Sequence, residues 1–182
     1  MITGLKAEEQ HQHKNGGGWV ANTATVEDSV HIGANARVSG NAQVYGDSQV
    51  YGDSQVYGNA RVYGNAQVYG NAQVYGNARV YGNARVSGNA WVSGDACVSS
   101  DAWVSCNARV LGDAWVETPL FIQGTNHGVS NSSHGKLSIG CVTLTFAEWK
   151  KQYRALGKRE GYTEKQIKEY GAIIALATKI GK

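Results

Sequence analysis

The sequence predicts an all-β solenoid, a parallel β-helix of about six triangular coils, followed by a small C-terminal α-helical cap. Three observations predict it. Val or Ile recurs at every sixth residue from Val20 through Ile122, which makes eighteen hexapeptides. Ala or Ser stands four residues after the Val or Ile at all fourteen positions from Ala36 to Ala114. Gly followed by Asn or Asp occupies two adjacent positions between the Val and the next Ala or Ser in ten successive repeats, the first at Gly40.

Each hexapeptide reads as a short strand in which the small residue and the Val face inward, followed by a corner at Gly-Asn, a pair that accepts positive φ cheaply. A single unit is unstable, because fixing six residues costs roughly 6–12 kcal/mol. Burying one Val and one Ala returns only about 2–3 kcal/mol. The coils must therefore stack. Three corners close a coil of eighteen residues, so the repeats predict six coils over residues 19–124.

The run Gly-Asn-Ala-Arg-Val-Tyr-Gly-Asn-Ala, residues 58–66, resembles the bacterial hexapeptide-transferase superfamily. The resemblance covers residues 20–124 and implies a left-handed parallel β-helix, although parallel crossovers are usually right-handed. Members of this superfamily include acyltransferases, nucleotidyl-sugar transferases and zinc carbonic anhydrases, and most of them are trimers. The resemblance therefore implies a homotrimer, and it raises an acyl-CoA-dependent acyltransferase, with acetyl-CoA or another acyl-CoA as cofactor, as the alternative function.

Residues 1–18 are polar and end in three glycines, and we expect them to form an arm or cap over the open edge of the first coil. They lack the apolar segment of a signal peptide, and no stretch is long and apolar enough for a membrane span. The three cysteines fit neither a disulfide framework nor a structural zinc site. These features predict a cytoplasmic protein without a membrane partner.

After Ile122 the period fails, and the polar residues 125–136 predict a loop. Residues 137–182 predict a strand and two amphipathic helices, each opened by a capping box, at Thr145 and at Thr163. Five apolar residues of this module are expected to cover the last coil, with its layer of Val110, Val116 and Ile122: Phe146, Trp149, Tyr153, Ile167 and Ile174. The lysines at 150, 151, 158, 165 and 168 are expected on the solvent side.

The tail, with Ile139-Gly-Cys141, a hydroxyl residue and a helix bearing Trp and Tyr, resembles a module that follows hexapeptide solenoids encoded by phages and prophages. The resemblance implies a protein of phage or prophage type. Such proteins often carry His where this chain has Leu144, so chemistry based on that His is not expected here.

Few residues are candidates for a catalytic or metal-binding role. Hexapeptide acyltransferases use a histidine base beside a groove, and the weak candidates here are His31 in the solenoid and His127 and His134 after it. No loop is extruded between residues 20 and 124 to shape an acceptor site. His11 and His13 lie on one side of an extended segment and are weak metal candidates, without the third ligand that a zinc site requires. We therefore expect no metal and no cofactor.

The outward-facing positions of the strands give the stronger indication of a binding function. Tyr follows the inward Val in seven successive repeats, and eighteen-residue coils would stack these tyrosines as 45/63/81, 51/69 and 57/75, one ladder on each face. Three tryptophans take over the other outward column. Tyr, Trp and Arg dominate binding interfaces, although aromatic residues also fit sheets simply as cross-strand pairs. The candidate binding residues are Tyr45, Tyr51, Tyr57, Tyr63, Tyr69, Tyr75, Tyr81, Trp91, Trp103, Trp115, Arg61, Arg79 and Arg85.

The charge distribution along the chain limits the classes of partner that the solenoid can bind. Residues 19–124 carry five arginines and eight acidic residues, a net −3, whereas residues 136–182 carry ten basic residues and four glutamates, a net +6. A negative solenoid disfavours nucleic acid. We therefore expect a non-catalytic binding or assembly protein whose aromatic ladders contact a protein or carbohydrate, for example to sequester a host factor.

Overall fold

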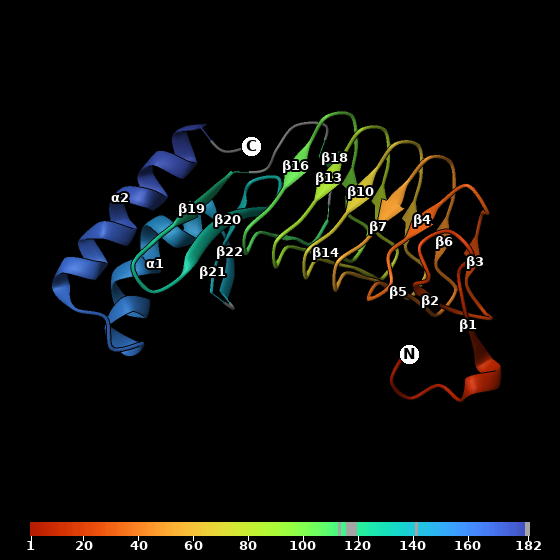
Figure 1. The fold of residues 1–182 in the computed structure, drawn as a ribbon. Coiled ribbons are helices and arrows are strands. Elements are labelled where there is room, and N and C mark those ends of the chain that lie inside the picture. The colour runs from red at the N-terminus through yellow and green to blue at the C-terminus, as the bar shows by residue number, and fades with distance from the viewer. Residues whose placement is uncertain (113, 116–119, 141, 181–182) are drawn as a thin grey trace. The chain divides into compact units, whose positions relative to one another are not determined.

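A computed structural model describes residues 1–112, 114–115, 120–140 and 142–180. The chain divides into two units (Figure 1). The first contains Met1–Asn107 and Leu111–Thr118, and the second contains Ala108–Val110 and Pro119–Lys182. Val116 and Cys141, which the sequence places in the last coil and in the C-terminal module, lie outside the described residues.

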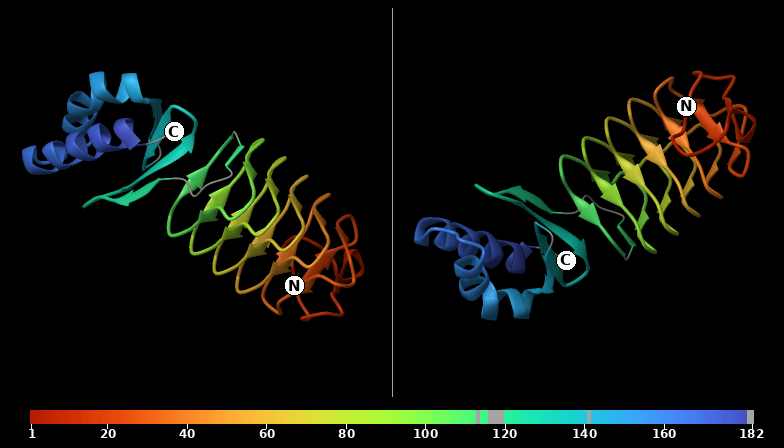
Figure 2. Two further views of the ribbon diagram at one scale, coloured as in Figure 1. Left: turned by 90° about the horizontal axis from the view of Figure 1, so that it is seen from above. Right: turned by 90° about the horizontal axis from the view of Figure 1, so that it is seen from below.

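The first unit is a β-solenoid of about five turns, whose short strands stack in rungs (Figure 2). Its strands form three parallel sheets, in the orders β2-β5-β8-β11-β14, β4-β7-β10-β13-β16 and β3-β6-β9-β12-β15-β18. The strands are β2 (Trp19–Ala21), β3 (Thr25–Val26), β4 (His31–Ile32), β5 (Arg37–Val38), β6 (Gln43–Val44), β7 (Gln49–Val50), β8 (Gln55–Val56), β9 (Arg61–Val62), β10 (Gln67–Val68), β11 (Gln73–Val74), β12 (Arg79–Val80), β13 (Arg85–Val86), β14 (Trp91–Val92), β15 (Cys97–Val98), β16 (Trp103–Val104) and β18 (Ala114–Trp115).

The eighteen-residue coil follows from the register, because Val68 pairs with Val50 on one side and with Val86 on the other. Strands β2 to β16 complete five turns of three strands, fewer than the six coils that eighteen hexapeptides predict. The reason lies at the last repeat. Ile122 belongs to β19 (Phe121–Gln123), which pairs antiparallel with β20 instead of extending a parallel ladder.

The inward columns form the core of the solenoid as the sequence predicts: the Val and Ala side chains from Ala36 to Val98 are fully buried. The corners favour glycine for two reasons that Gly58 illustrates. Its φ is +73°, and a Cβ there would lie 3.0 Å from the backbone nitrogen of Gly76 in the next coil. Ser100 and Cys106 occupy the equivalent corner position with φ of 57° and 59°.

The N-terminal arm lies over the start of the solenoid. A 3-10 turn (η1, Ala7–Glu9) leads into β1 (Gln10–Gln12), which pairs antiparallel with β2, so that His11 lies opposite Val20. A further bridge joins Gly17 to Gly33. The arm therefore covers the strand edge that the first coil would otherwise expose.

The second unit is an antiparallel sheet with two helices. Besides β17 (Arg109–Val110) and β19, it contains β20 (Gly128–Ser133), β21 (Lys136–Ile139) and β22 (Val142–Thr145), and the sheet order is β19-β20-β21-β22. The range 125–136, which the sequence predicts as a loop, thus contains a six-residue strand, because its backbone pairs with the strands on both sides. Helices α1 (Phe146–Arg159) and α2 (Glu164–Ile180) follow, and the capping box at Thr145 is present.

The apolar residues of the C-terminal module that are predicted to cover the last coil pack within their own unit, and Ile167 is buried as well; the covering of the last coil itself stays a prediction. Trp149 and Ile174 are buried in a core with Val129 and Leu137 of the sheet, and Phe146 and Tyr153 pack against that core. Trp149 Nε1 donates a hydrogen bond of 2.8 Å to the Leu137 carbonyl. The five lysines predicted on the solvent side are all exposed.

Candidate functional site

The tyrosines of the solenoid form the three ladders that the period predicts. Tyr45, Tyr63 and Tyr81 stack beside β6, β9 and β12, with ring centroids 5.0 and 4.8 Å apart. Tyr51 stacks on Tyr69 at 5.0 Å on the second face, and Tyr57 stacks on Tyr75 at 4.9 Å on the third. Planes of successive rings differ by only 3–9°. Each ladder is therefore a rigid row with the spacing of the coils.

Stacking decides which part of each ring a partner can reach. Within a ladder the π-faces cover one another, so the ring edges and hydroxyl groups are what remains for contact. Desolvation in this half-buried setting raises the pKa of Tyr51, Tyr57 and Tyr63 above the ordinary value, and the stacked neighbour raises it further. The hydroxyl groups therefore stay protonated and serve as hydrogen-bond donors and acceptors at neutral pH. A sugar or base cannot insert between rings that already stack on each other.

The two outward columns pack against each other across successive coils. The residue after the Val contacts the residue sixteen positions later, which precedes the Val of the next coil. Tyr57 Oη donates to Gln73 Oε1 at 3.1 Å, and Tyr75 meets Trp91 edge to face with centroids 6.4 Å apart. Where the tyrosine column ends, Trp103 Nε1 donates to Ser87 Oγ at 3.0 Å. The two columns therefore contact each other between successive coils, and in the last of these pairs a large side chain, Trp103, faces a small one, Ser87.

Charges are segregated between the flat faces and the corners. Arginine is the only charged residue at the outward strand positions between His31 and Leu111, whereas Asp47, Asp53, Asp95 and Asp101 all stand at corners. Arg61 and Arg79 are exposed and lie next to each other in parallel register on β9 and β12. Arg85 is exposed on a different face, on β13. The solenoid is negative overall, but its flat faces are positive.

A second set of ladders runs along the corners, and the sequence reasoning missed it. The side-chain amides of seven corner asparagines, from Asn41 to Asn89, donate from Nδ2 to Oδ1 of the residue one coil further on. One ladder runs from Asn41 through Asn59 and Asn77 to Asp95, with distances of 3.4, 3.2 and 3.0 Å. Two more link 65, 83 and 101, and 71, 89 and 107. Recurrence of Asn at eighteen residues was the available signal, because an amide can both donate and accept.

The candidate histidines have local partners. His31 Nδ1 lies 3.2 Å from Asn15 Oδ1. His127 Nδ1 is paired with the hydroxyl group of Tyr162 at 2.5 Å, and the two rings are nearly parallel. His134 is exposed. Among the described residues, none of these three histidines lines the cavity beside Trp149 or the one beside Leu5.

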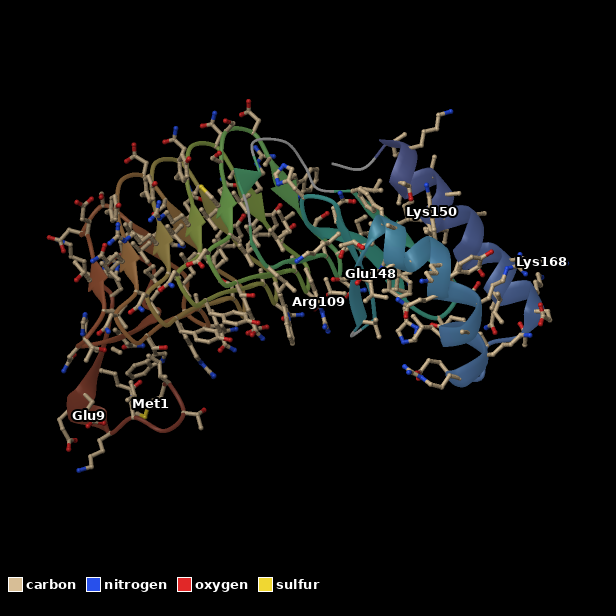
Figure 3. All side chains as sticks on the ribbon, turned by 180° about the vertical axis from the view of Figure 1, so that it is seen from behind. Met1, Glu9, Arg109, Glu148, Lys150 and Lys168 are labelled. Atoms are coloured by element: carbon tan, nitrogen blue, oxygen red, sulfur yellow. The ribbon has the colours of Figure 1, made fainter. Side chains whose placement is uncertain are left out.

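The metal candidates are placed differently from each other. His11 is exposed and its Nδ1 lies 3.0 Å from Asn22 Oδ1, whereas His13 is buried and its Nδ1 lies 3.3 Å from the Asn15 backbone. No group of three or more His, Cys, Asp or Glu side chains that could hold a metal ion occurs among the described residues. The side chain of Trp115, the third tryptophan of the outward column, lies outside the described residues. Figure 3 shows the side chains that are described.

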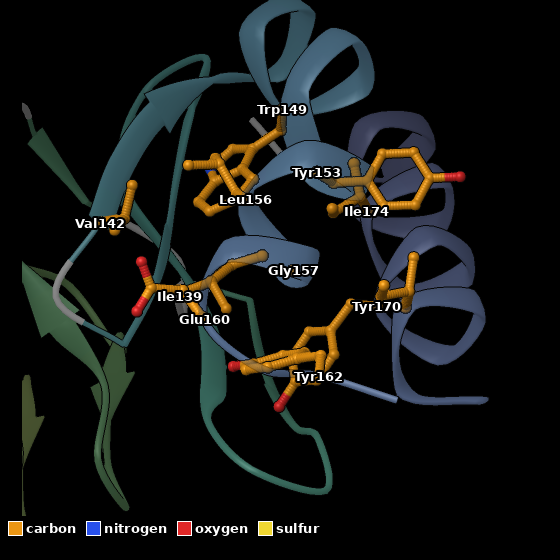
Figure 4. A pocket seen from close by; sticks show the side chains of 11 residues that line it. Ile139, Val142, Trp149, Tyr153, Leu156, Gly157, Glu160, Tyr162, Tyr170 and Ile174 are labelled. Atoms are coloured by element: carbon orange, nitrogen blue, oxygen red, sulfur yellow. The ribbon is translucent and has the colours of Figure 1, made fainter. Parts of the chain in front are cut away.

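The second unit contains a cavity of about 50 Å³ (Figure 4). Its described lining is apolar and aromatic apart from Glu160, which pairs with Arg159 at 2.9 Å. Pockets that bind drug-sized ligands or cofactors occupy about 300–1,000 Å³. The cavity is therefore too small for a coenzyme. The lining residues are Ile139, Val142, Trp149, Tyr153, Leu156, Gly157, Glu160, Tyr162, Ile167, Tyr170 and Ile174.

The fold and its faces define a β-solenoid repeat protein. In agreement with this class, a family model described as the YdcK β-solenoid repeat matches four segments of the first unit, residues 36–52, 54–70, 72–88 and 78–94. Together the matches cover less than a third of the chain, and they span the part that carries the tyrosine ladders. Neither a curated protein nor a solved structure matches the chain significantly. Among the described helices, none has the length and apolar character to span a bilayer.

Proposed function

We propose that the protein is a non-catalytic binding or assembly protein, whose tyrosine faces contact a protein partner. The observation that carries the proposal is the set of three ladders. Seven tyrosines are held in rigid rows, so little side-chain entropy is lost when a partner binds. Their edges and hydroxyl groups combine apolar area with hydrogen bonding, which is the character of interface tyrosines.

The proposal includes the finer features that the sequence implies. These are a left-handed helix of the hexapeptide type, a homotrimer in which one or two faces pack, a phage or prophage origin, and action in the bacterial cytosol on a host factor. The ladder geometry favours protein over carbohydrate, because sugars bind aromatic residues mainly through ring faces, and the faces within each ladder are already stacked on neighbouring tyrosines.

The test removes one ladder at a time. Tyr63→Ser, Tyr69→Ser and Tyr75→Ser each interrupt a different face, and serine is compatible with the fold because Ser99, Ser87 and Ser93 stand in the same three columns. Wild type and variants are compared by sedimentation velocity and by affinity capture from lysate of a bacterial host. We expect one variant to lose self-association or to lose a captured protein that the other two variants retain.

Equal behaviour of wild type and all three variants would overturn the proposal. The alternative function, an acyl-CoA-dependent acyltransferase, is tested alongside these variants. Acetyl-CoA is added to the wild type, and thermal stability and release of free CoA thiol are measured. A saturable rise in melting temperature at micromolar acetyl-CoA, with thiol release, would establish the enzyme instead.

A further inference from the structure

The face formed by β6, β9, β12 and β15 carries an ordered charge pattern along the solenoid axis. Asp47 follows β6 at the corner, Arg61 and Arg79 stand on β9 and β12, and Asp95 and Asp101 flank β15. The pattern is therefore acidic, basic, basic, acidic over four adjacent strands. A positive belt two coils deep is bounded by carboxylates at both ends.

The two arginines of this belt are close to each other, and no ion pair with either of them occurs among the described residues. Neighbouring parallel strands lie about 4.8 Å apart, so the two stems are in register at that spacing. Like charges directly opposite each other in a sheet are destabilising. An anionic group between them would relieve the repulsion and accept hydrogen bonds from two planar guanidinium groups.

The tyrosine ladder lies beside the arginine column on the same face. Tyr63 precedes Arg79 by sixteen residues, the relation in which outward side chains of successive coils meet, as Tyr57 meets Gln73, and the positive charge of Arg79 opposes the rise in the Tyr63 pKa. Tyr45 and Tyr81 continue the row on either side. The face thus offers charge for a carboxylate next to apolar edges and hydroxyl groups for the chain that carries it.

The acidic ends of the pattern set the size of the ligand. A long polyanion such as single-stranded nucleic acid, laid along the face, would extend from Arg61 and Arg79 toward Asp47 at one end and toward Asp95 and Asp101 at the other. A short segment with two carboxylates would contact the belt alone. In an extended peptide, side chains on one side recur at alternate residues, about 6.6 Å apart, a distance that two flexible arginine side chains can match.

We propose that Arg61 and Arg79, together with Tyr45, Tyr63 and Tyr81, bind a short acidic peptide segment of the type Glu-x-Glu on a protein partner. This inference rests on the proposed function of the tyrosine faces and names the chemistry of the partner for one of them.

The experiment titrates a fluorescein-labelled peptide, Gly-Ser-Glu-Gly-Glu-Ser-Gly, with the full chain at 20 mM NaCl and follows fluorescence anisotropy. The matched peptide has Gln in place of both Glu. The double variant Arg61→Gln/Arg79→Gln removes the belt, and glutamine is compatible with the fold because Gln43 occupies the same column. The control Arg37→Gln/Arg85→Gln removes the same charge from the other two faces.

We expect wild type and the control double variant to bind the glutamate peptide alike, and the belt variant to bind at least fivefold more weakly. The glutamine peptide should bind wild type as weakly as the glutamate peptide binds the belt variant. Equal losses in the two double variants would mean binding by overall charge, and tighter binding of a twenty-nucleotide oligo-dT than of the peptide would mean a nucleic-acid site. Either result, or no peptide binding by wild type, overturns the inference. The tyrosine variants decide the proposed function independently, since they are scored without this peptide.

Discussion

Replacing Val68 by Asp tests the inward register, on which the faces of the solenoid depend. Val68 lies in β10, is fully buried, and stacks between Val50 and Val86 of the adjacent coils. Removing the buried Val side chain costs about 2 kcal/mol. The new carboxylate has no partner in a core made of Val and Ala, so at pH 7 it must be protonated or remain charged in an apolar site.

The size of the effect follows from this burial. Protonating a carboxyl about three pH units above its ordinary pKa costs about 4 kcal/mol, at 1.36 kcal/mol per unit. Burying the neutral acid without a hydrogen bond adds about 1–3 kcal/mol. The total, on the order of 7–9 kcal/mol, is comparable to the whole stability of a typical domain, about 5–15 kcal/mol. Because each coil is stabilised mainly by its neighbours, we expect the central coils to unfold.

Urea unfolding followed by circular dichroism measures the effect, with Gln67→Asp as the matched control. Gln67 precedes Val68 in the same strand and points outward, where it is half-buried. The control should change the free energy of unfolding by less than about 1 kcal/mol. Burial raises the pKa of the new carboxyl in the folded state, so the loss in Val68→Asp should shrink as the pH falls toward 4. Equal destabilisation by the two substitutions would refute the register.

Three further predictions concern the corners, the ladders and the second unit. Asn77→Asp removes the amide donor to Asp95 and places two carboxylates side by side, so we expect a loss of about 1–2 kcal/mol in urea unfolding, relieved below pH 4; an unchanged midpoint at pH 7 would contradict the ladder. The folded-state pKa of Tyr63 is raised, so its ladder contributes stability below the unfolded pKa of about 10, and this stability is lost at higher pH. Absorbance at 295 nm should therefore show that tyrosine ionisation accompanies alkaline unfolding and does not precede it. Trp149→Ala should destabilise the second unit by about 3–5 kcal/mol, with faster amide exchange around Leu137 and none of this effect in the solenoid coils; unchanged exchange would refute the assigned core.

Some of the candidate site was predictable because it depends only on a fixed period. Once the coil has eighteen residues, Tyr45 must lie over Tyr63 and Tyr57 over Tyr75, and the structure confirms these stacks. The asparagine ladders follow from the same period, but they required attention to which side chains can both donate and accept. The segregation of arginine to faces and of aspartate to corners is likewise present in the sequence, although net charge alone conceals it.

Contacts between segments that do not repeat were not predictable in this way. The polar range 125–136 contains a strand because β19 and β21 satisfy its backbone on both sides, a condition that composition does not reveal. The apolar faces of α1 and α2 were correctly read as needing a surface to cover. The structure buries Trp149 and Ile174 against strands of their own unit, and the covering of the last coil by this module stays a prediction.

By itself, the sequence determined the solenoid: the period of six residues sets the strands, the corners, the buried columns and the tyrosine ladders, because every coil meets a near copy of itself. Tertiary structure alone decided where the repeat stops and how the chain continues beyond it. Ile122 keeps the period but pairs antiparallel with Val129. Tyr170 accepts a hydrogen bond from the backbone of Asn126 across more than forty residues of chain. Such contacts join unlike segments far apart in the chain, and no local pattern encodes which segments will meet.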